Sequence, residues 1–418
     1  MCQGCVPEYF EFKESPAPLP QNWLNSRFLA QATEEKDMGT DSFEYRVARD
    51  APCPIIDAHV HVFPQKLMDA VWTFFDNFYW PIRYKKNYIA TRADFLLDQG
   101  IRHVVLLVYA HKNGIARDLN KFLAHTVNSM NERYASLPQP PNSTSKRVRV
   151  ASGLATVMPG EPDARAILAE AFTTLGLSGI KMHSHVQCVA ANHPNMDEVY
   201  ETCIEFDKPV LIHAGKEPNS KAYKVDAGKI CDFSIVEDVL RRYPRLRICV
   251  PHLGMNQYEE FFDLLDKYPN LYLDTTMTLG AFFQSLNSPS ATTTSSCSSS
   301  CDHTTHTTKN NTSTTTTALK PIAEMLRTML LRHSDRILYG TDWPNIPYDW
   351  CRELANLVSL VDGDGEATAR NEGERVRKEE HRTKETDEAL ENILWRNASR
   401  FYRISEHDLG LTPLSPNL

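Results

Sequence analysis

Short apolar runs rich in β-branched residues recur along the chain. They span residues 55–62, 101–109, 148–157, 178–183, 209–213, 246–251, 270–275 and 335–341. Most are nearly continuous in valine, isoleucine or leucine, which is typical of strands that are buried on both faces. Apolar residues at helical spacing fill most of the intervening segments, as at 163–175, 196–206, 234–243 and 257–268.

This alternation of strands and helices predicts a parallel sheet whose outer face is covered by helices. Eight such units are the number that closes a (β/α)8 barrel. An open, doubly wound sheet is the structural alternative, because it is built from the same units. We therefore predict an α/β protein organised as a (β/α)8 barrel.

The barrel is expected to occupy residues 52–404, after a proline-punctuated N-terminal extension at 1–51 and before a C-terminal tail at 405–418. Two segments interrupt its pattern. Residues 286–318 are rich in serine and threonine, and residues 362–387 in glycine, glutamate, arginine and lysine. Because these segments hold too few apolar residues to offset their ordering entropy, we expect disordered or loop insertions that decorate the barrel.

Composition narrows the choice of partners. The 45 basic and 53 acidic side chains give a net charge of -8 and are dispersed, which argues against nucleic acid or an anionic membrane surface. No apolar run approaches the roughly 18 residues that a membrane helix needs, and the N-terminus lacks the features of a secretion signal. The ten cysteines are irregularly spaced, as expected for reduced thiols. We expect a cytoplasmic protein that acts on a small molecule.

Two histidines lie two residues apart in the first predicted strand, in the sequence IIDAHVHVFP. His59 and His61 should point to the same face of the strand, about 6.5–7 Å apart along it. His213 and Asp342 fall at the ends of the fifth and eighth predicted strands, and the carboxyl ends of barrel strands face a common mouth. Three imidazoles and one carboxylate suit a single catalytic divalent metal, zinc first, with manganese or iron as alternatives.

Two residues are candidates for proton transfer beside this metal. His252 follows the sixth predicted strand, and imidazole titrates near neutral pH. It could instead be a fifth ligand or a histidine packed in a loop. Asp342 could accept a proton from water while it also binds the ion.

Five further residues are candidates for substrate binding. Lys181 lies inside an apolar strand, where an unpaired ammonium is costly to bury, so it could reach the mouth and bind a substrate carboxylate. Alternatively, it could pair with a buried acid or, once carbamylated, bridge two metals. His183 and His185 repeat the spacing of two residues, and Lys216 and His111 lie in loops after strands. Each of these four could also have a structural or merely solvated role.

In this order, the motifs DAHVHVFP, GIKMHSHVQ, VLIHAGKEP, VPHLGM and YGTDWP resemble the amidohydrolase superfamily. They look most like the metal-dependent branch that contains aminocarboxymuconate semialdehyde decarboxylase, γ-resorcylate decarboxylase and pyrone-dicarboxylate lactonase. The resemblance implies a distorted TIM barrel with one divalent metal, usually zinc. It also implies that His59, His61, His213 and Asp342 are the ligands and that His252 is the acid/base.

Three functions are compatible with these residues. The first is hydrolysis, in which a metal-activated water attacks a small ester, lactone or amide. This substrate is expected to be anionic. The second is non-oxidative decarboxylation of an unsaturated or aromatic acid. The third is an inactive barrel that serves as a binding or scaffold protein, against which the full set of ligand types argues. The expected partners are a small-molecule substrate and, as an option, a second copy of the chain in a homodimer.

Overall fold

The computed structural model describes residues 51, 53–82, 85, 94–136, 149–216, 223, 225–282, 316–363 and 383–411. Almost all of the predicted N-terminal extension, most of both predicted insertions and residues 412–418 of the predicted tail lie outside the described residues. The described part of the tail packs on the barrel, because Leu409 is buried and the carbonyl of Asp408 accepts a hydrogen bond from Arg149 N at 3.0 Å.

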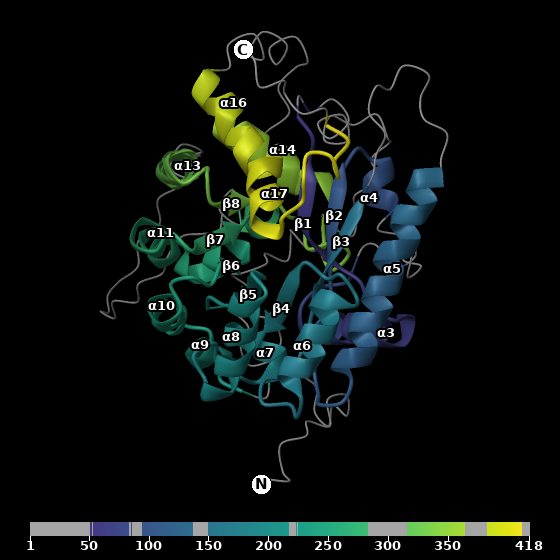
Figure 1. Ribbon diagram of the computed structural model, residues 1–418. Coiled ribbons are helices and arrows are strands. Elements are labelled where there is room, and N and C mark those ends of the chain that lie inside the picture. Colours follow the sequence, from purple (N-terminus) through teal and green to yellow (C-terminus); the bar gives the residue numbers. More distant parts are fainter. Residues whose placement is uncertain are drawn as a thin grey trace, which may run out of the picture.

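Eight parallel strands form one sheet in the order β1 to β8, which confirms the predicted barrel and excludes the open, doubly wound alternative. The strands are β1 Ile56–His61, β2 His103–Leu107, β3 Ala151–Ala155, β4 Gly179–His183, β5 Val210–His213, β6 Ile248–Val250, β7 Leu271–Asp274 and β8 Ile337–Leu338. They lie at the centre of the molecule, with helices around them (Figure 1).

Main-chain hydrogen bonds join the segment after β8 to β1 and thereby nearly close the barrel. Ala58 N donates to the carbonyl of Tyr339 at 2.9 Å, and His61 N donates to that of Trp343 at 2.8 Å. In the opposite direction, Asp342 N donates to the carbonyl of His59 at 3.0 Å. The last strand is shorter than predicted because the chain beyond it bonds to β1 as a turn.

Helices connect successive strands and cover the outside of the barrel (Figure 1). They are α3 Gln65–Phe78, α4 Asp94–Asp98, α5 Ala116–Ser136, α6 Ala164–Thr173, α7 Ser184–Gln187, α8 Asp197–Glu205, α9 Ala227–Ile230, α10 Phe233–Arg242, α11 Tyr258–Lys267, α13 Thr316–Arg332, α14 Cys351–Asp362, α16 Lys384–Glu391 and α17 Asn397–Tyr402. A single 3-10 turn forms η2 Pro194–Met196, and a kinked 3-10 segment forms η4 His252–Gln257. π-Helical segments form η5 Thr278–Phe282 and η6 Asn392–Arg396.

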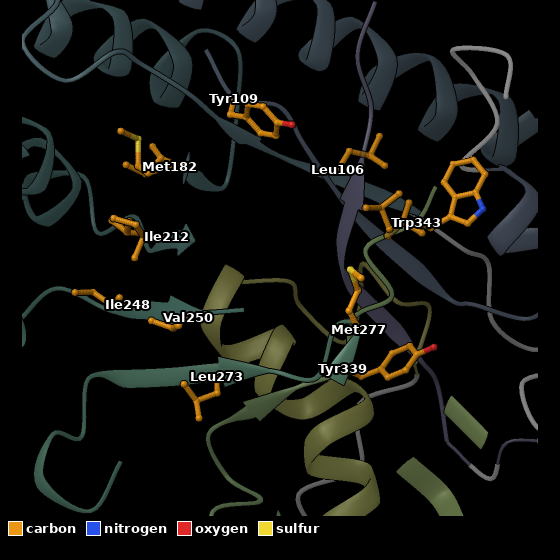
Figure 2. Packing of buried hydrophobic residues seen from close by; sticks show 14 of the residues in the cluster. Leu106, Tyr109, Met182, Ile212, Ile248, Val250, Leu273, Met277, Tyr339 and Trp343 are labelled. Atoms are coloured by element: carbon orange, nitrogen blue, oxygen red, sulfur yellow. The ribbon is translucent and has the colours of Figure 1, made fainter. Parts of the chain in front are cut away.

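Two apolar cores stabilise this arrangement. The larger lies between strands and helices, and Figure 2 shows Ile212, Val250 and Leu273 projecting into it from neighbouring strands. The smaller contains Leu107 and Leu211 together with Phe401 of α17. Near-continuous apolar strands are therefore explained by burial on both faces. Among the described helices, none combines the length and the apolar composition that a membrane crossing requires.

Candidate metal centre

A bulge in β1 directs its histidines. The pairing of β1 with β2 changes register between Asp57 and Val60, so that two residues of β1 oppose one residue of β2. His59 is one of these two residues, and a bulge can re-aim a side chain. His59 and His61 lie beside each other, with their Nε2 atoms 3.3 Å apart, and both side chains are buried.

Asp342 completes a compact set of three donors. Its Oδ1 lies 3.0 Å from Nε2 of His61 and 3.3 Å from Nε2 of His59. Metal–ligand distances near 2.0–2.1 Å place neighbouring donors of a tetrahedral ion about 3.3 Å apart. The spacing and the chemistry of these three buried donors therefore fit a divalent metal, and they form a group that could hold one.

The turn after β8 places Asp342 by means of a second buried carboxylate. Asp57 accepts hydrogen bonds from Thr341 N at 3.1 Å and from Thr341 Oγ1 at 2.6 Å. The Thr341 hydroxyl in turn accepts from Trp343 N at 3.0 Å. Asp342 itself has a φ of 65°, a left-handed conformation that L residues adopt only under constraint.

Close approach of this turn to β1 also requires a glycine. A Cβ atom added to Gly340 would lie 2.9 Å from Cβ of His59 and 2.7 Å from Cγ2 of Thr276. Contacts this short do not occur between real Cβ atoms, so any larger residue would force the backbone away from the histidine.

Asp274, at the end of β7, connects the metal group to His252. Its Oδ2 lies 2.9 Å from Nδ1 of His59, and its Oδ1 accepts a hydrogen bond from His252 N at 3.1 Å. The same Oδ1 accepts from the main-chain N–H of Thr276 at 3.2 Å and from the Thr276 hydroxyl. Thr276 also contacts Nδ1 of His252, through its carbonyl at 3.0 Å and its hydroxyl at 2.9 Å.

Burial and neighbouring charges set the protonation of the group. Burial lowers the pKa values of His59, His61 and His252, which keeps their imidazoles neutral, as metal binding and base catalysis require. Burial acts to raise the pKa of Asp342, but its hydrogen bond with His61 and its electrostatic interactions with His61 and His59 outweigh burial and lower that pKa. The side chains thus present neutral nitrogen and anionic oxygen donors.

Lys181 lies directly beside the metal group. Its side chain is fully buried, and its Nζ lies 3.3 Å from Nε2 of His59, the atom that faces His61 and Asp342. The lysine therefore approaches a candidate metal ligand. Its predicted role in substrate binding stays a prediction.

A second group of imidazoles surrounds His213. The ring of His213 stacks on that of His183 with centroids 4.3 Å apart, and lies 4.7 Å from His185 and 4.9 Å from His252. Tyr109 contacts the same group, 4.8 Å from His183. Among the described residues, His59, His61 and Asp342 form a group whose ligand atoms all lie within 4.8 Å of one another, and His213 is outside this group. The role of His213 as a fourth ligand stays a prediction.

The remaining predicted residues lie in loops. Lys216 forms an ion pair with Asp232 at 2.5 Å, and about half of its side chain is exposed. His111 is partly exposed, and burial and the charge of Lys112 lower its pKa. Roles of Lys216 and His111 in substrate binding also stay predictions.

The sequence predicts no role for four residues of this site. Asp57 and Asp274 hold neighbouring residues through buried carboxylates, and Thr276 and Thr341 connect strand ends through their hydroxyls. The sequence gives a weak indication for Asp57 and Asp274, because each lies within an apolar strand, where burying an unpaired charge is costly and a partner is therefore expected.

Comparison with known families gives one match to most of the chain. The model of a family described as Amidohydrolase matches residues 56–404. No curated protein gives a significant match.

Solved structures share the fold at low sequence identity. A 5-carboxyvanillate decarboxylase of Novosphingobium aromaticivorans, solved with manganese and 4-hydroxy-3-methoxy-5-nitrobenzoic acid, gives a TM-score of 0.51 at 13% identity, over 84% of this chain and 97% of that one. An uncharacterised TIM-barrel protein of Bordetella bronchiseptica gives a TM-score of 0.50 at 15% identity, over 83% of this chain and 98% of that one. A probable 2-pyrone-4,6-dicarboxylic acid hydrolase of Acinetobacter baumannii gives a TM-score of 0.46 at 14% identity, over 84% of this chain and 99% of that one.

Proposed function

Because this chain belongs to the amidohydrolase family and is an enzyme, we propose that it hydrolyses a small ester, lactone or amide with the help of one divalent metal, preferentially zinc. The observation that carries this proposal is the donor spacing. Three buried atoms, from His59, His61 and Asp342, approach one another to 3.0–3.3 Å, as they would around a common ion.

When bound there, a divalent metal would polarise a carbonyl and lower the pKa of water toward neutrality. The side chains of the site would perform the proton transfers. The carbonyl of Thr276 accepts from Nδ1 of His252, so the basic lone pair of His252 is on Nε2. This Nε2 takes the proton of the attacking water as oxygen bonds to the carbonyl carbon, and returns it to the leaving alcohol or amine. Asp342 can share the first of these steps.

The substrate is expected to be small and anionic. Lys181 places a fully buried amine beside His59, and His183 and His185 lie against His213 on the neighbouring strand end. A carboxylate of the substrate would be attracted to an ammonium group at Lys181, and the two histidines would offer hydrogen bonds to that carboxylate. Lys216 contributes less in this scheme, because Asp232 already pairs with it.

A decarboxylase is the second candidate, and the aromatic side chains near the metal group favour it. Tyr109 packs against His61, Phe63 and His183 with ring centroids 4.8–5.7 Å apart. Such flat surfaces suit an aromatic acid, and one structure of similar fold is a carboxyvanillate decarboxylase that was solved with an aromatic acid. In this reaction Nε2 of His252 would take up a proton from water and deliver it to the carbon from which carbon dioxide leaves.

Product analysis distinguishes the two reactions. The purified enzyme, loaded with zinc or with manganese, is incubated with a panel of esters and lactones and with a panel of unsaturated and aromatic acids. Hydrolysis consumes alkali in a pH-stat, whereas decarboxylation releases carbon dioxide into the headspace. Carbon dioxide release without hydrolysis would refute the first proposal, and a metal-loaded enzyme inactive on both panels would refute both proposed reactions.

The matched control is His252→Asn. Loss of the acid/base should lower the rate of either reaction by about 10²–10⁴-fold. Metal content should stay at the wild-type level, since His252 is outside the three-residue metal group.

A further inference from the structure

We propose that Asp274 is a positioning residue that keeps the imidazole proton of His59 on Nδ1 and thereby keeps Nε2 available to the metal. The inference rests on the proposed metal site and adds a residue that acts through a ligand. Asp274 and His59 are both buried, and they are 215 positions apart in the chain.

The contacts of Asp274 define the direction of each hydrogen bond. Two main-chain N–H groups, those of His252 and Thr276, point at Oδ1 from 3.1 and 3.2 Å. The Thr276 hydroxyl donates to the same oxygen. Oδ2 is left for Nδ1 of His59 at 2.9 Å. A carboxylate only accepts hydrogen bonds, so Nδ1 of His59 carries the proton.

This tautomer is the one that the metal group needs. With the proton on Nδ1, the lone pair of His59 is on Nε2, which faces His61 at 3.3 Å and Asp342 at 3.3 Å. A carboxylate behind a ligating histidine fixes the orientation of the ring and increases the basicity of the ligand.

The same carboxylate also orients the proposed acid/base. The Thr276 hydroxyl that donates to Asp274 lies 2.9 Å from Nδ1 of His252, and the Thr276 carbonyl lies 3.0 Å from it. One buried acid therefore fixes a metal ligand and, through Thr276, the residue that moves protons.

Replacing Asp274 by asparagine tests whether residue 274 sets the tautomer of His59. The two main-chain N–H groups at Oδ1 require the amide oxygen on their side, which places the amide NH2 opposite His59. The amide would then donate to Nδ1 and move the imidazole proton to Nε2, the nitrogen needed by the metal. A similar replacement behind a catalytic histidine is known to impair function through the wrong tautomer.

Alanine at position 274 has a different effect. It imposes no tautomer, but it leaves a cavity and removes the acceptor of Thr276 N, while His252 N keeps only the Thr276 hydroxyl at 3.3 Å. We expect Asp274→Asn to lower zinc affinity about 100-fold and Asp274→Ala about tenfold, measured by competition with a chromophoric chelator. The thermal stability of the metal-free proteins should follow the opposite order, with the alanine variant melting lower.

Nitrogen-15 NMR of the histidine-labelled, metal-free protein reads the tautomer directly. Wild-type His59 should carry its proton on Nδ1 and the Asp274→Asn variant on Nε2. A proton on Nε2 of His59 in the wild type would overturn the proposal, and so would a zinc affinity of the alanine variant as low as that of the asparagine variant. The control Glu353→Gln changes another fully buried carboxylate, which holds Leu279 N and Gly280 N, and should leave zinc affinity unchanged.

Failure of the underlying metal site gives a different result. In that case the wild type itself would bind no zinc, while NMR would still report the proton of His59 on Nδ1.

Discussion

Replacing Thr341 by valine removes the hydroxyl that ties the turn after β8 to β1. This hydroxyl donates to Asp57 Oδ2 at 2.6 Å and accepts from Trp343 N at 3.0 Å. Valine has nearly the same shape, so the change deletes two hydrogen bonds and creates little cavity. Asp342 is the next residue in the turn, and its position beside His59 depends on the same contacts.

The expected loss of stability comes from Asp57 Oδ2 and Trp343 N, the two groups that lose their hydrogen bond to the hydroxyl. Asp57 and Thr341 are fully buried, so water does not replace the missing partner. A buried hydrogen bond to a charged group contributes about 1.5–3 kcal/mol, and an unsatisfied buried N–H costs about 1–3 kcal/mol. We therefore expect Thr341→Val to lower the free energy of unfolding by about 3–5 kcal/mol. Because burial raises the pKa of Asp57 to about 7, the measurement belongs at pH 8, where the carboxylate is ionised.

Urea unfolding of the metal-free protein gives this free energy, and zinc titration gives the affinity. Thr341→Ser is the matched control, since it keeps the hydroxyl and should lose at most about 1.5 kcal/mol. Zinc affinity should fall at least about tenfold in the valine variant and little in the serine variant. A loss below about 1 kcal/mol, or equal losses in the two variants, would refute the role given to this hydroxyl.

Three further predictions concern individual residues. Gly340→Ala should cost about 1–3 kcal/mol and weaken zinc binding, because its Cβ would lie 2.9 Å from Cβ of His59; a thermal melt and a zinc titration equal to wild type would contradict this. Lys216→Ala breaks a solvent-exposed ion pair with Asp232 and should leave the urea midpoint of unfolding close to that of wild type, so a clear drop in that midpoint would show another role for Lys216. Burial raises the pKa of Glu353 from 4.5 to about 8, against hydrogen bonds that lower it. The native state then binds a proton that the unfolded chain releases, and the stability from this group is lost as the pH rises from 4.5 through 8. Between pH 6 and pH 9, wild type should therefore lose about 2–3 kcal/mol more than Glu353→Gln, and parallel pH profiles of the two proteins would be inconsistent with this pKa.

The barrel could be predicted from the sequence because each strand is recognisable from its own residues. Each strand is an apolar run, and burial on both faces makes that run nearly continuous. His59, His61 and Asp342 could be placed together for the same reason, since residues at the carboxyl ends of barrel strands share one mouth.

The details of the site depend on contacts between distant segments. The bulge in β1 is a matter of register against β2, which no periodicity within either strand reports. Asp274 lies at the end of an apolar run like several other polar residues, and only the folded chain shows that it contacts His59. The stacking of His213 on His183 likewise depends on side-chain orientation rather than on position along the strand.

The proposed function depends on one metal ion bound by His59, His61 and Asp342. A crystal structure of the protein grown with zinc, with anomalous data collected at the zinc edge, tests it most directly. We expect one peak within about 2.0–2.2 Å of Nε2 of His59, Nε2 of His61 and Oδ1 of Asp342. Zinc bound elsewhere, or these three side chains without an ion between them at saturating zinc, would contradict the claim.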